Sequence, residues 1–185
     1  MLSIKLLLGI ICFTLTGSIR MLDGNLLAHT NKHVNDHRSN LIRIAQNEIG
    51  VREKTGNNDG VRVEAYLSSV RLKKGQPWCA AFLSWVYAQE GLLKPRSGWS
   101  PDLLPYSRLT RSALPGNILG IYFPALKRIA HVGLIIKLDG DLVTSIEGNT
   151  NVNGSREGDG VYTKIRHIKT IYRIADWVAE RGKLE

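Results

Sequence analysis

Hydrophobic residues recur with a helical spacing in the first half of the chain and with a strand spacing in the second. The helical stretches end near turn residues, and they are 40–49, 61–70 and 78–90. The later apolar runs are short and rich in β-branched and aromatic residues. The expected strands are 118–123, 130–138, 142–147, 161–168 and 170–174. Helices followed by an antiparallel sheet of about five strands predict an α+β fold.

The third helical stretch begins with a cysteine. Pro77 restricts its own φ and disfavours helical angles at Gln76, so we expect the helix to begin at or just after Trp78. The first turn of a helix has unpaired N–H groups and the positive end of the dipole, and both favour the nucleophilic thiolate. Cys79 is therefore a candidate nucleophile. The alternative is that it is a small buried apolar residue, as most free cysteines are.

The N-terminus has the pattern of a secretory signal peptide over residues 1–18. A short basic start is followed by an apolar run at 6–15 and then by small residues. An uncleaved anchor is the alternative, although the run is short for a membrane span. Removal of this segment would take Cys12 with it and leave Cys79 without a disulfide partner. A single thiol in an exported protein is a candidate reactive group.

Between the signal segment and the folded domain, residues 19–39 are polar and are expected to form an irregular linker. His29, His33 and His37 recur there every four residues, but no cysteine or glutamate joins them at a ligand spacing. We therefore predict no metal site and no cofactor. The catalytic domain is expected over residues 40–185.

Turn-forming residues predict two loops in this domain. The loop at 54–60 is rich in Asn, Asp and Gly, but its spacing differs from that of a twelve-residue calcium loop, so a structural role is expected. The stretch 94–117 contains four of the six prolines and predicts a long irregular connection. Connections of this length often have a functional role, and this one is expected to wall a cleft.

A cysteine nucleophile needs a base and a group that orients the base. His131 begins the run 131–136, whose alternate residues Val132, Leu134 and Ile136 form an apolar face. His131 lies on the other face, where Gly133 leaves space beside it. His131 is therefore the candidate base.

The next strand supplies the orienting group if a three-residue loop at 139–141 joins the two strands. Leu134 then lies opposite Ile146, Asn149 lies opposite His131, and Glu147 lies on the diagonal. A two-residue Asp-Gly turn would move Glu147 and Asn149 to the wrong face. The alternative is that Glu-Gly-Asn at 147–149 is only a turn after a strand.

Four motifs in this order resemble the CHAP family of cysteine- and histidine-dependent amidohydrolases and peptidases. They are Pro-Trp-Cys-Ala-Ala-Phe at 77–82, Gly-Asn-Ile at 116–118, Ala-His-Val-Gly at 130–133 and Ile-Glu-Gly-Asn-Thr-Asn at 146–151. The resemblance covers roughly residues 40–175. The family usually has aspartate where Asn117 stands in this chain.

This resemblance implies a papain-like fold in which Cys79 attacks an amide carbon and His131 takes and returns the proton. It implies that Glu147 orients His131 and that Asn149 is a supporting polar group. The backbone N–H of Cys79 is a natural oxyanion donor, and Gln76 is a weaker candidate for the second donor. Family members commonly cut bacterial peptidoglycan, either between sugar and peptide or within the peptide.

The net charge of the chain indicates which class of binding partner to expect. The chain of 185 residues has a formal net charge of +9 and a pI near 9.8, which favours an acidic polymer such as bacterial wall. The charge is dispersed and no nucleic-acid motif occurs, so we expect no nucleic-acid partner. We expect an exported monomer that acts in the periplasm or at the cell wall, without a membrane span after signal removal. The alternatives are a non-catalytic wall-binding module and an antibacterial or phage-type lytic effector with the same chemistry.

Overall fold

The structure is a computed structural model that describes residues 12–153 and 158–179. The chain divides into two compact units, Met1–Asp36 and His37–Glu185. Helix α1, Cys12–Gln46, begins in the first unit and ends in the second. The other described helices and strands all belong to the second unit.

The segment before residue 40 differs from the expected irregular linker, because α1 covers all of 19–39. This segment contains no proline and one glycine, Gly24, so little in it interrupts helical hydrogen bonding. The expected signal peptide lies mostly on residues 1–11, outside the described residues. Within the described part of the chain, no helix is both long and apolar enough to span a membrane.

Helices α2, Val61–Ser69, and α3, Cys79–Gln89, lie where the apolar spacing predicted them. Eight of the eleven side chains of α3 are buried, so this helix lies inside the domain and not on its surface. The stretch 94–117 is more ordered than expected, since it contains two 3-10 helices and a short strand. The described 3-10 helices are η1 Ser100–Leu103, η2 Tyr106–Arg108, η3 Pro124–Leu126 and η4 Ile168–Thr170.

The described strands form one antiparallel sheet of six, in the order β1-β6-β2-β3-β4-β5. They are β1 Leu109–Thr110, β2 Ile118–Phe123, β3 Arg128–Asp139, β4 Leu142–Thr150, β5 Gly160–His167 and β6 Arg173–Ala175. The α+β prediction is confirmed. Strand β1 was not predicted, because two residues are too few for a periodic pattern, and the strand predicted at 170–174 begins only at Arg173, after η4.

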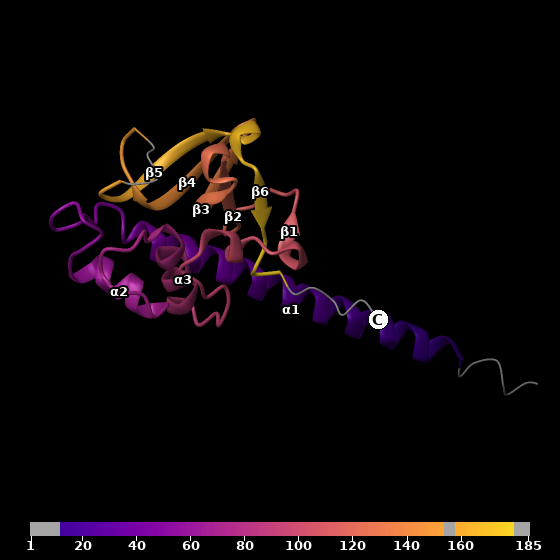
Figure 1. Cartoon of the computed structure of the whole chain (residues 1–185). Helices are drawn as coiled ribbons and strands as arrows, with labels where there is room; N and C mark the ends of the chain where they lie inside the picture. Colours follow the sequence, from indigo (N-terminus) through magenta and orange to yellow (C-terminus); the bar gives the residue numbers. More distant parts are fainter. Residues whose placement is uncertain (1–11, 154–157, 180–185) are drawn as a thin grey trace, which may run out of the picture. The chain divides into compact units, whose positions relative to one another are not determined.

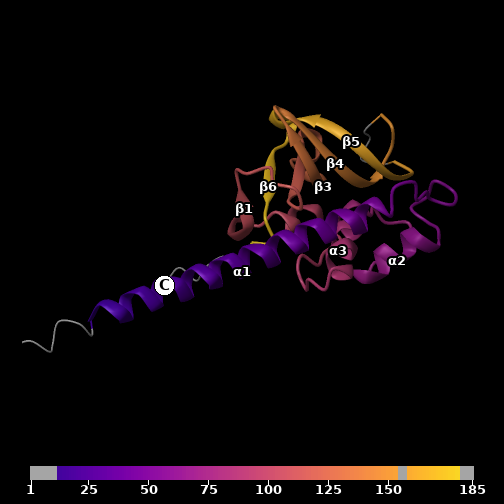
Figure 2. The same cartoon turned by 180° about the vertical axis from the view of Figure 1, so that it is seen from behind.

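The sheet packs as one layer against α3, and α2 packs against α3; both views show the two helices on the same side of the sheet (Figures 1 and 2). Helix α3 contacts β3 and β4, the two strands that carry the predicted base and its partner. Gly148 makes the close approach between α3 and β4 possible, because a Cβ at this position would lie 2.7 Å from the Trp78 ring and 2.9 Å from Phe82. One hydrophobic core cluster of the domain contains Ala113, Leu119, Ile135, Val143 and Ile174.

The hairpin between β3 and β4 differs from the prediction. Its turn has two residues, Gly140 and Asp141, with Asp139 paired to Leu142, and Gly140 has a φ of 55°. A bulge between Ile135 and Lys137 then shifts the register by one residue. The predicted pairing of Leu134 with Ile146 is therefore present, although the predicted three-residue loop is wrong.

Asn117, where the CHAP family usually has aspartate, is buried at the start of β2. Its Oδ1 accepts a hydrogen bond from Nη1 of Arg38 at 2.8 Å, and its Nδ2 donates to the backbone oxygen of Ser112 at 2.8 Å. An aspartate could accept the first hydrogen bond but could not donate the second. The amide therefore suits this position in both of its roles.

Candidate active site

Cys79 is the first residue of α3, and its side chain is 4% exposed. The residue before it, Trp78, is the N-cap and donates its backbone N–H to Oδ1 of Asn149 at 3.0 Å. The Ser100 hydroxyl lies 3.4 Å from the sulfur, within reach of a hydrogen bond to sulfur. The N–H of Cys79 belongs to the first turn, where helical N–H groups have no carbonyl partner within the helix.

His131 lies on β3, buried beside Cys79. Its Nε2 lies 2.8 Å from Oε2 of Glu147 on the neighbouring strand β4. Glu147 occupies the space left by Gly133, because a Cβ on Gly133 would come within 2.7 Å of the Glu147 side chain. The diagonal placement predicted from the strand register is therefore present in the structure, and Gly133 makes room for it.

Nδ1 of His131 is buried without a hydrogen-bond partner, and within the described residues it is the one buried side-chain nitrogen or oxygen in this condition. A buried polar atom of this kind is costly, so it usually has a reason. Because Nε2 is taken by Glu147, Nδ1 is the nitrogen available to exchange a proton with the thiol or with a substrate.

Glu147 is fully buried, and both oxygens of its carboxylate have hydrogen-bond partners. Arg166 donates to both carboxylate oxygens, at 2.7 and 2.6 Å, in a fork arrangement. The hydroxyl of Ser145 donates to Oε1 at 2.7 Å. These contacts fix the carboxylate, and through it the plane of the His131 ring.

Glu147, His131 and Cys79 each shift the pKa of a neighbour in the direction that favours its charged form. Burial alone would raise the pKa of Glu147, but hydrogen bonds from Arg166 and His131 outweigh it and hold the pKa below its ordinary value. Burial alone would lower the pKa of His131, but the interactions with Cys79 and Glu147 raise it to about 9.

The pKa of the Cys79 thiol is shifted downward, opposite to that of His131. Burial alone would raise the pKa of Cys79, but His131, with smaller contributions from Ser100 and the backbone of Val132, lowers it below its ordinary value. A raised pKa at the imidazole and a lowered pKa at the thiol both favour a thiolate–imidazolium pair. The arrangement can therefore supply a nucleophile and a proton donor at once.

A cleft of about 460 Å³ leads to Cys79. Its walls come from the residues after α2, from the loop that begins the 94–117 connection, and from the start of β3. The lining residues are Val70, Leu72, Gln76, Pro77, Cys79, Arg96, Ser97, Gly98, Trp99, Ser100, Arg128 and Ala130. The stretch expected to wall a cleft does so, and Gln76 faces the same space as the thiol.

The structure places Asn149 apart from the other three predicted site residues. The strand pairing is irregular between Glu147 and Thr150, and Asn149 has a φ of 55°, so strand alternation does not hold there. Its Oδ1 accepts the N–H of Trp78, and its Nδ2 donates to Asn58 Oδ1 at 3.1 Å and to the oxygen of Gly158 at 3.0 Å. Asn149 thus positions the start of α3, and none of these hydrogen bonds involves the imidazole.

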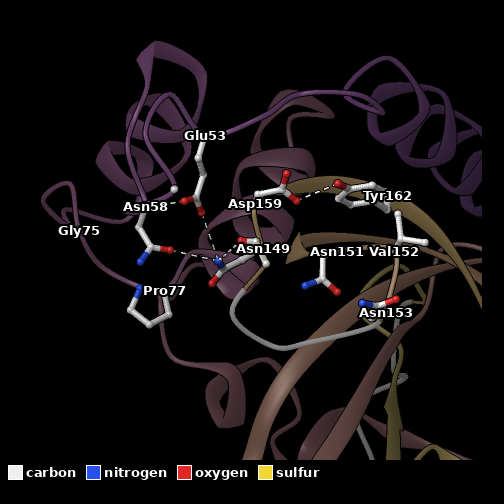
Figure 3. A pocket seen from close by; sticks show the side chains of 12 residues that line it. Glu53, Asn58, Gly75, Pro77, Asn149, Asn151, Val152, Asn153, Asp159 and Tyr162 are labelled. Carbon is white, nitrogen blue, oxygen red and sulfur yellow. Dashed lines mark hydrogen bonds between the residues drawn. The ribbon is translucent and has the colours of Figure 1, made fainter.

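Asn149 lies in a second, larger pocket of about 760 Å³ (Figure 3). Glu53 connects several parts of this pocket, since it accepts hydrogen bonds from the Trp78 indole at 2.8 Å and from the backbone of Asn58 at 2.8 Å. Asp159 accepts a hydrogen bond from the Tyr162 hydroxyl at 2.7 Å. The polar side chains of this pocket largely bond to one another.

Sequence reasoning did not identify Ser100, Ser145 or Arg166. A signal existed for Arg166, because a buried carboxylate needs a cationic partner and β5 carries basic residues on the face beside β4. Ser100 lies 21 positions after Cys79 in the sequence. Tertiary packing brings its hydroxyl to the thiol, and no local sequence pattern encodes this contact.

The histidines before the domain do not form a metal-ligand cluster with other groups. The rings of His29 and His33 lie 4.6 Å apart edge to face, while Nδ1 of His37 contacts Glu90 at 2.9 Å. Over residues 12–153 and 158–179 there is no group of three or more His, Cys, Asp or Glu side chains placed to hold a metal ion.

Comparison of the chain with protein-family models, with curated proteins and with solved structures gives no match.

Proposed function

We propose that this protein is a cysteine hydrolase that cleaves amide bonds through an acyl-enzyme on Cys79. The observation that carries the proposal is the buried His131, with Nε2 held by Glu147 at 2.8 Å and Nδ1 without a partner beside the thiol. A histidine in a purely structural role would have both nitrogens satisfied. A base that is oriented at one nitrogen and open at the other is the arrangement that nucleophilic catalysis requires.

In the first half of the proposed reaction, the Cys79 thiolate attacks the amide carbon, and the carbonyl oxygen becomes an oxyanion. The N–H of Cys79 donates to this oxyanion at the helix start. The tetrahedral intermediate collapses as the carbon–nitrogen bond breaks, and the imidazolium of His131 gives its Nδ1 proton to the leaving amine. The products are a free amine and a thioester on Cys79.

In the second half, neutral His131 takes a proton from water through Nδ1, and the resulting hydroxide attacks the thioester carbon. The carbon–sulfur bond breaks, the carboxylic acid product leaves, and the thiolate–imidazolium pair forms again. Glu147 stays ionised throughout, because the two hydrogen bonds from Arg166 hold it as a carboxylate. Its charge stabilises the imidazolium in both halves.

The proposed substrate is bacterial cell-wall peptidoglycan. The resemblance of the Cys, His and Glu motifs to the CHAP family supports this substrate and a papain-like arrangement of helix and sheet. The net charge of +9 supports an acidic polymer as the partner. Either an N-acetylmuramoyl-L-alanine amidase or a peptide endopeptidase has this chemistry, and the pattern at residues 1–18 supports export to the periplasm or the cell wall.

The test replaces Cys79 with alanine and measures the release of soluble fragments from purified peptidoglycan. We expect release by the parent protein and none by Cys79→Ala, with unchanged circular dichroism. Mass analysis of the released fragments identifies the bond that is cut. A non-catalytic wall-binding module predicts a different outcome, namely wall binding without release and no fast labelling of Cys79 by iodoacetamide at neutral pH. That outcome would contradict the proposal.

A further inference from the structure

The cleft at Cys79 has a one-sided charge. Among the residues that the structure describes, its lining contains two arginines, Arg96 and Arg128, and no aspartate, glutamate or lysine. Neither guanidinium lies within ion-pair distance of a carboxylate among the described residues, although other arginines of the domain, such as Arg38 and Arg166, are paired. Two unpaired cations at the entrance to a buried nucleophile favour a substrate that brings its own negative charge.

Arg128 is the better placed of the two. It begins β3, three residues before His131, and is half-buried. Its guanidinium lies 3.9 Å from the centre of the Trp99 ring, and its Nη1 donates to the backbone oxygen of Ile129 at 3.0 Å. These contacts hold the fork in place and leave donors over for a ligand, since a guanidinium has five N–H groups.

Arg96 is more exposed but is also anchored, because its Nε donates to the backbone oxygen of Ser69 at 3.1 Å. The loop that carries it is held by reciprocal hydrogen bonds between Ser97 and Ser84, at 2.8 and 3.0 Å. Gly98 lets this loop press against Leu72, because a Cβ on Gly98 would lie 2.3 Å from the leucine side chain. These contacts hold the cleft wall that carries Arg96 in a fixed position.

We propose that the cleft selects a peptide segment with a free carboxylate close to the scissile amide, and that Arg128, assisted by Arg96, is its specificity determinant. Arg128 can donate two parallel hydrogen bonds to a carboxylate, whereas a carboxamide offers one acceptor and no charge. This inference rests on the proposed function, and it narrows the substrate to wall peptides whose acidic groups are not amidated.

The experiment uses soluble peptidoglycan fragments in two forms, with free carboxylates and after conversion of the carboxylates to carboxamides. Hydrolysis by the parent protein is measured with both forms. Binding of both forms to the Cys79→Ala protein is measured by calorimetry, which does not depend on turnover. We expect a preference for the free acid of roughly ten- to a hundredfold in kcat/KM, the size of a charge-assisted hydrogen-bond pair.

Three variants test the residue assignment. Arg128→Gln is expected to lose the preference by raising KM for the free acid, with little change for the amide form. Arg128→Lys is expected to restore part of it, since it keeps the charge but not the fork. Arg111→Gln removes the same charge outside the cleft, since Arg111 lines a separate pocket beside β1 and β6, and it is expected to keep the full preference.

The outcomes separate the two proposals. Equal hydrolysis and equal binding of both fragment forms, or an unchanged preference in Arg128→Gln, would overturn the carboxylate site while the hydrolase stands. Absence of hydrolysis of either form by the parent protein would overturn the hydrolase. An equal loss of preference in Arg111→Gln would show that only net charge matters, and it would also overturn the site.

Discussion

The two pockets on either side of Pro77 differ in charge, size and internal bonding. The cleft at Cys79 measures about 460 Å³, and its described lining contains arginines and no carboxylate. The pocket at Asn149 measures about 760 Å³, and its described lining contains Glu53 and Asp159 and no basic residue. In the larger pocket the polar side chains bond to one another. The thiol that lines the smaller one interacts with His131, whose Nδ1 has no hydrogen-bond partner among the described residues. The two regions therefore differ less in volume than in bonding, because the cleft at Cys79 has polar groups free to bind a ligand and the pocket at Asn149 has polar groups that bind one another.

Among the three substitutions Glu147→Gln, Ser100→Ala and Asn149→Ala, the first is expected to have the largest effect on activity. The imidazolium loses its charged partner, so we expect kcat/KM to fall by roughly 10²- to 10⁴-fold, the range for general acid–base catalysis. Cys79 and Glu147 together raise the pKa of His131 to about 9, so removal of the Glu147 charge should lower this pKa and move the alkaline limb of the pH–rate profile to lower pH. A pH series of kcat/KM for both proteins measures this.

Thermal denaturation gives the control for that variant, because the change also leaves Arg166 without its carboxylate. Ser145→Ala is the matched comparison, since it removes one hydrogen bond to Glu147 and keeps the charge. Its alkaline limb should remain near that of the parent protein. An alkaline limb that stays in place in Glu147→Gln would contradict the assigned role of Glu147.

Replacing Ser100 with alanine is expected to have an intermediate effect. The hydroxyl lies 3.4 Å from the sulfur and contributes to the lowered pKa of Cys79, so its removal should raise that pKa. The acid limb of kcat/KM then moves to higher pH, and activity at neutral pH falls by up to about tenfold, as for one hydrogen bond to a charged group. Alkylation of Cys79 by iodoacetamide as a function of pH checks the shift directly. A thiol titration identical to that of the parent protein would exclude a role for Ser100.

Replacing Asn149 with alanine is expected to have the smallest effect on the chemical step and a clear effect on stability. The N–H of Trp78 loses its acceptor inside the protein, which costs about 1–3 kcal/mol in the free energy of unfolding. Urea denaturation measures this, and the limbs of the pH–rate profile should not move. Asp159→Asn is the control within the same pocket, and we expect a change below about 0.5 kcal/mol because this residue is exposed. A shifted alkaline limb in Asn149→Ala would instead connect Asn149 with His131.

The sequence predicted the α+β fold class, the start of α3 and three of the residues that the structure brings together at the site, namely Cys79, His131 and Glu147. Cys79 was accessible to prediction because Pro77 marks the helix start. His131 and Glu147 were accessible because strand alternation holds for both of them, even though the hairpin turn was wrong. The bulge after Ile135 shifts the register by one residue, so the pairing from Leu134 toward the site is the one that was predicted with the wrong turn.

The remaining features depend on properties that local patterns do not carry. Asn149 was placed beside the base because strict alternation was assumed through it, whereas its positive φ turns it toward Trp78. The helical form of 19–39 was missed because polarity was taken as a sign of irregularity. Arg166 and Ser100 reach the site from distant parts of the chain, and only the fold brings them there.

The bulge in β3 makes the hairpin tolerant of a frame change. Without Ile136, the pairs Ile135–Ser145 and Lys137–Thr144 would follow one another in a regular ladder, and the turn at Gly140 would stay the same. The frame of the strand between His131 and Ile135 would not change, so the alignment of the imidazole with its carboxylate would survive. In a deletion scan of this strand, Ile136 is therefore the dispensable position, and Gly133, two residues after the base, is an indispensable one.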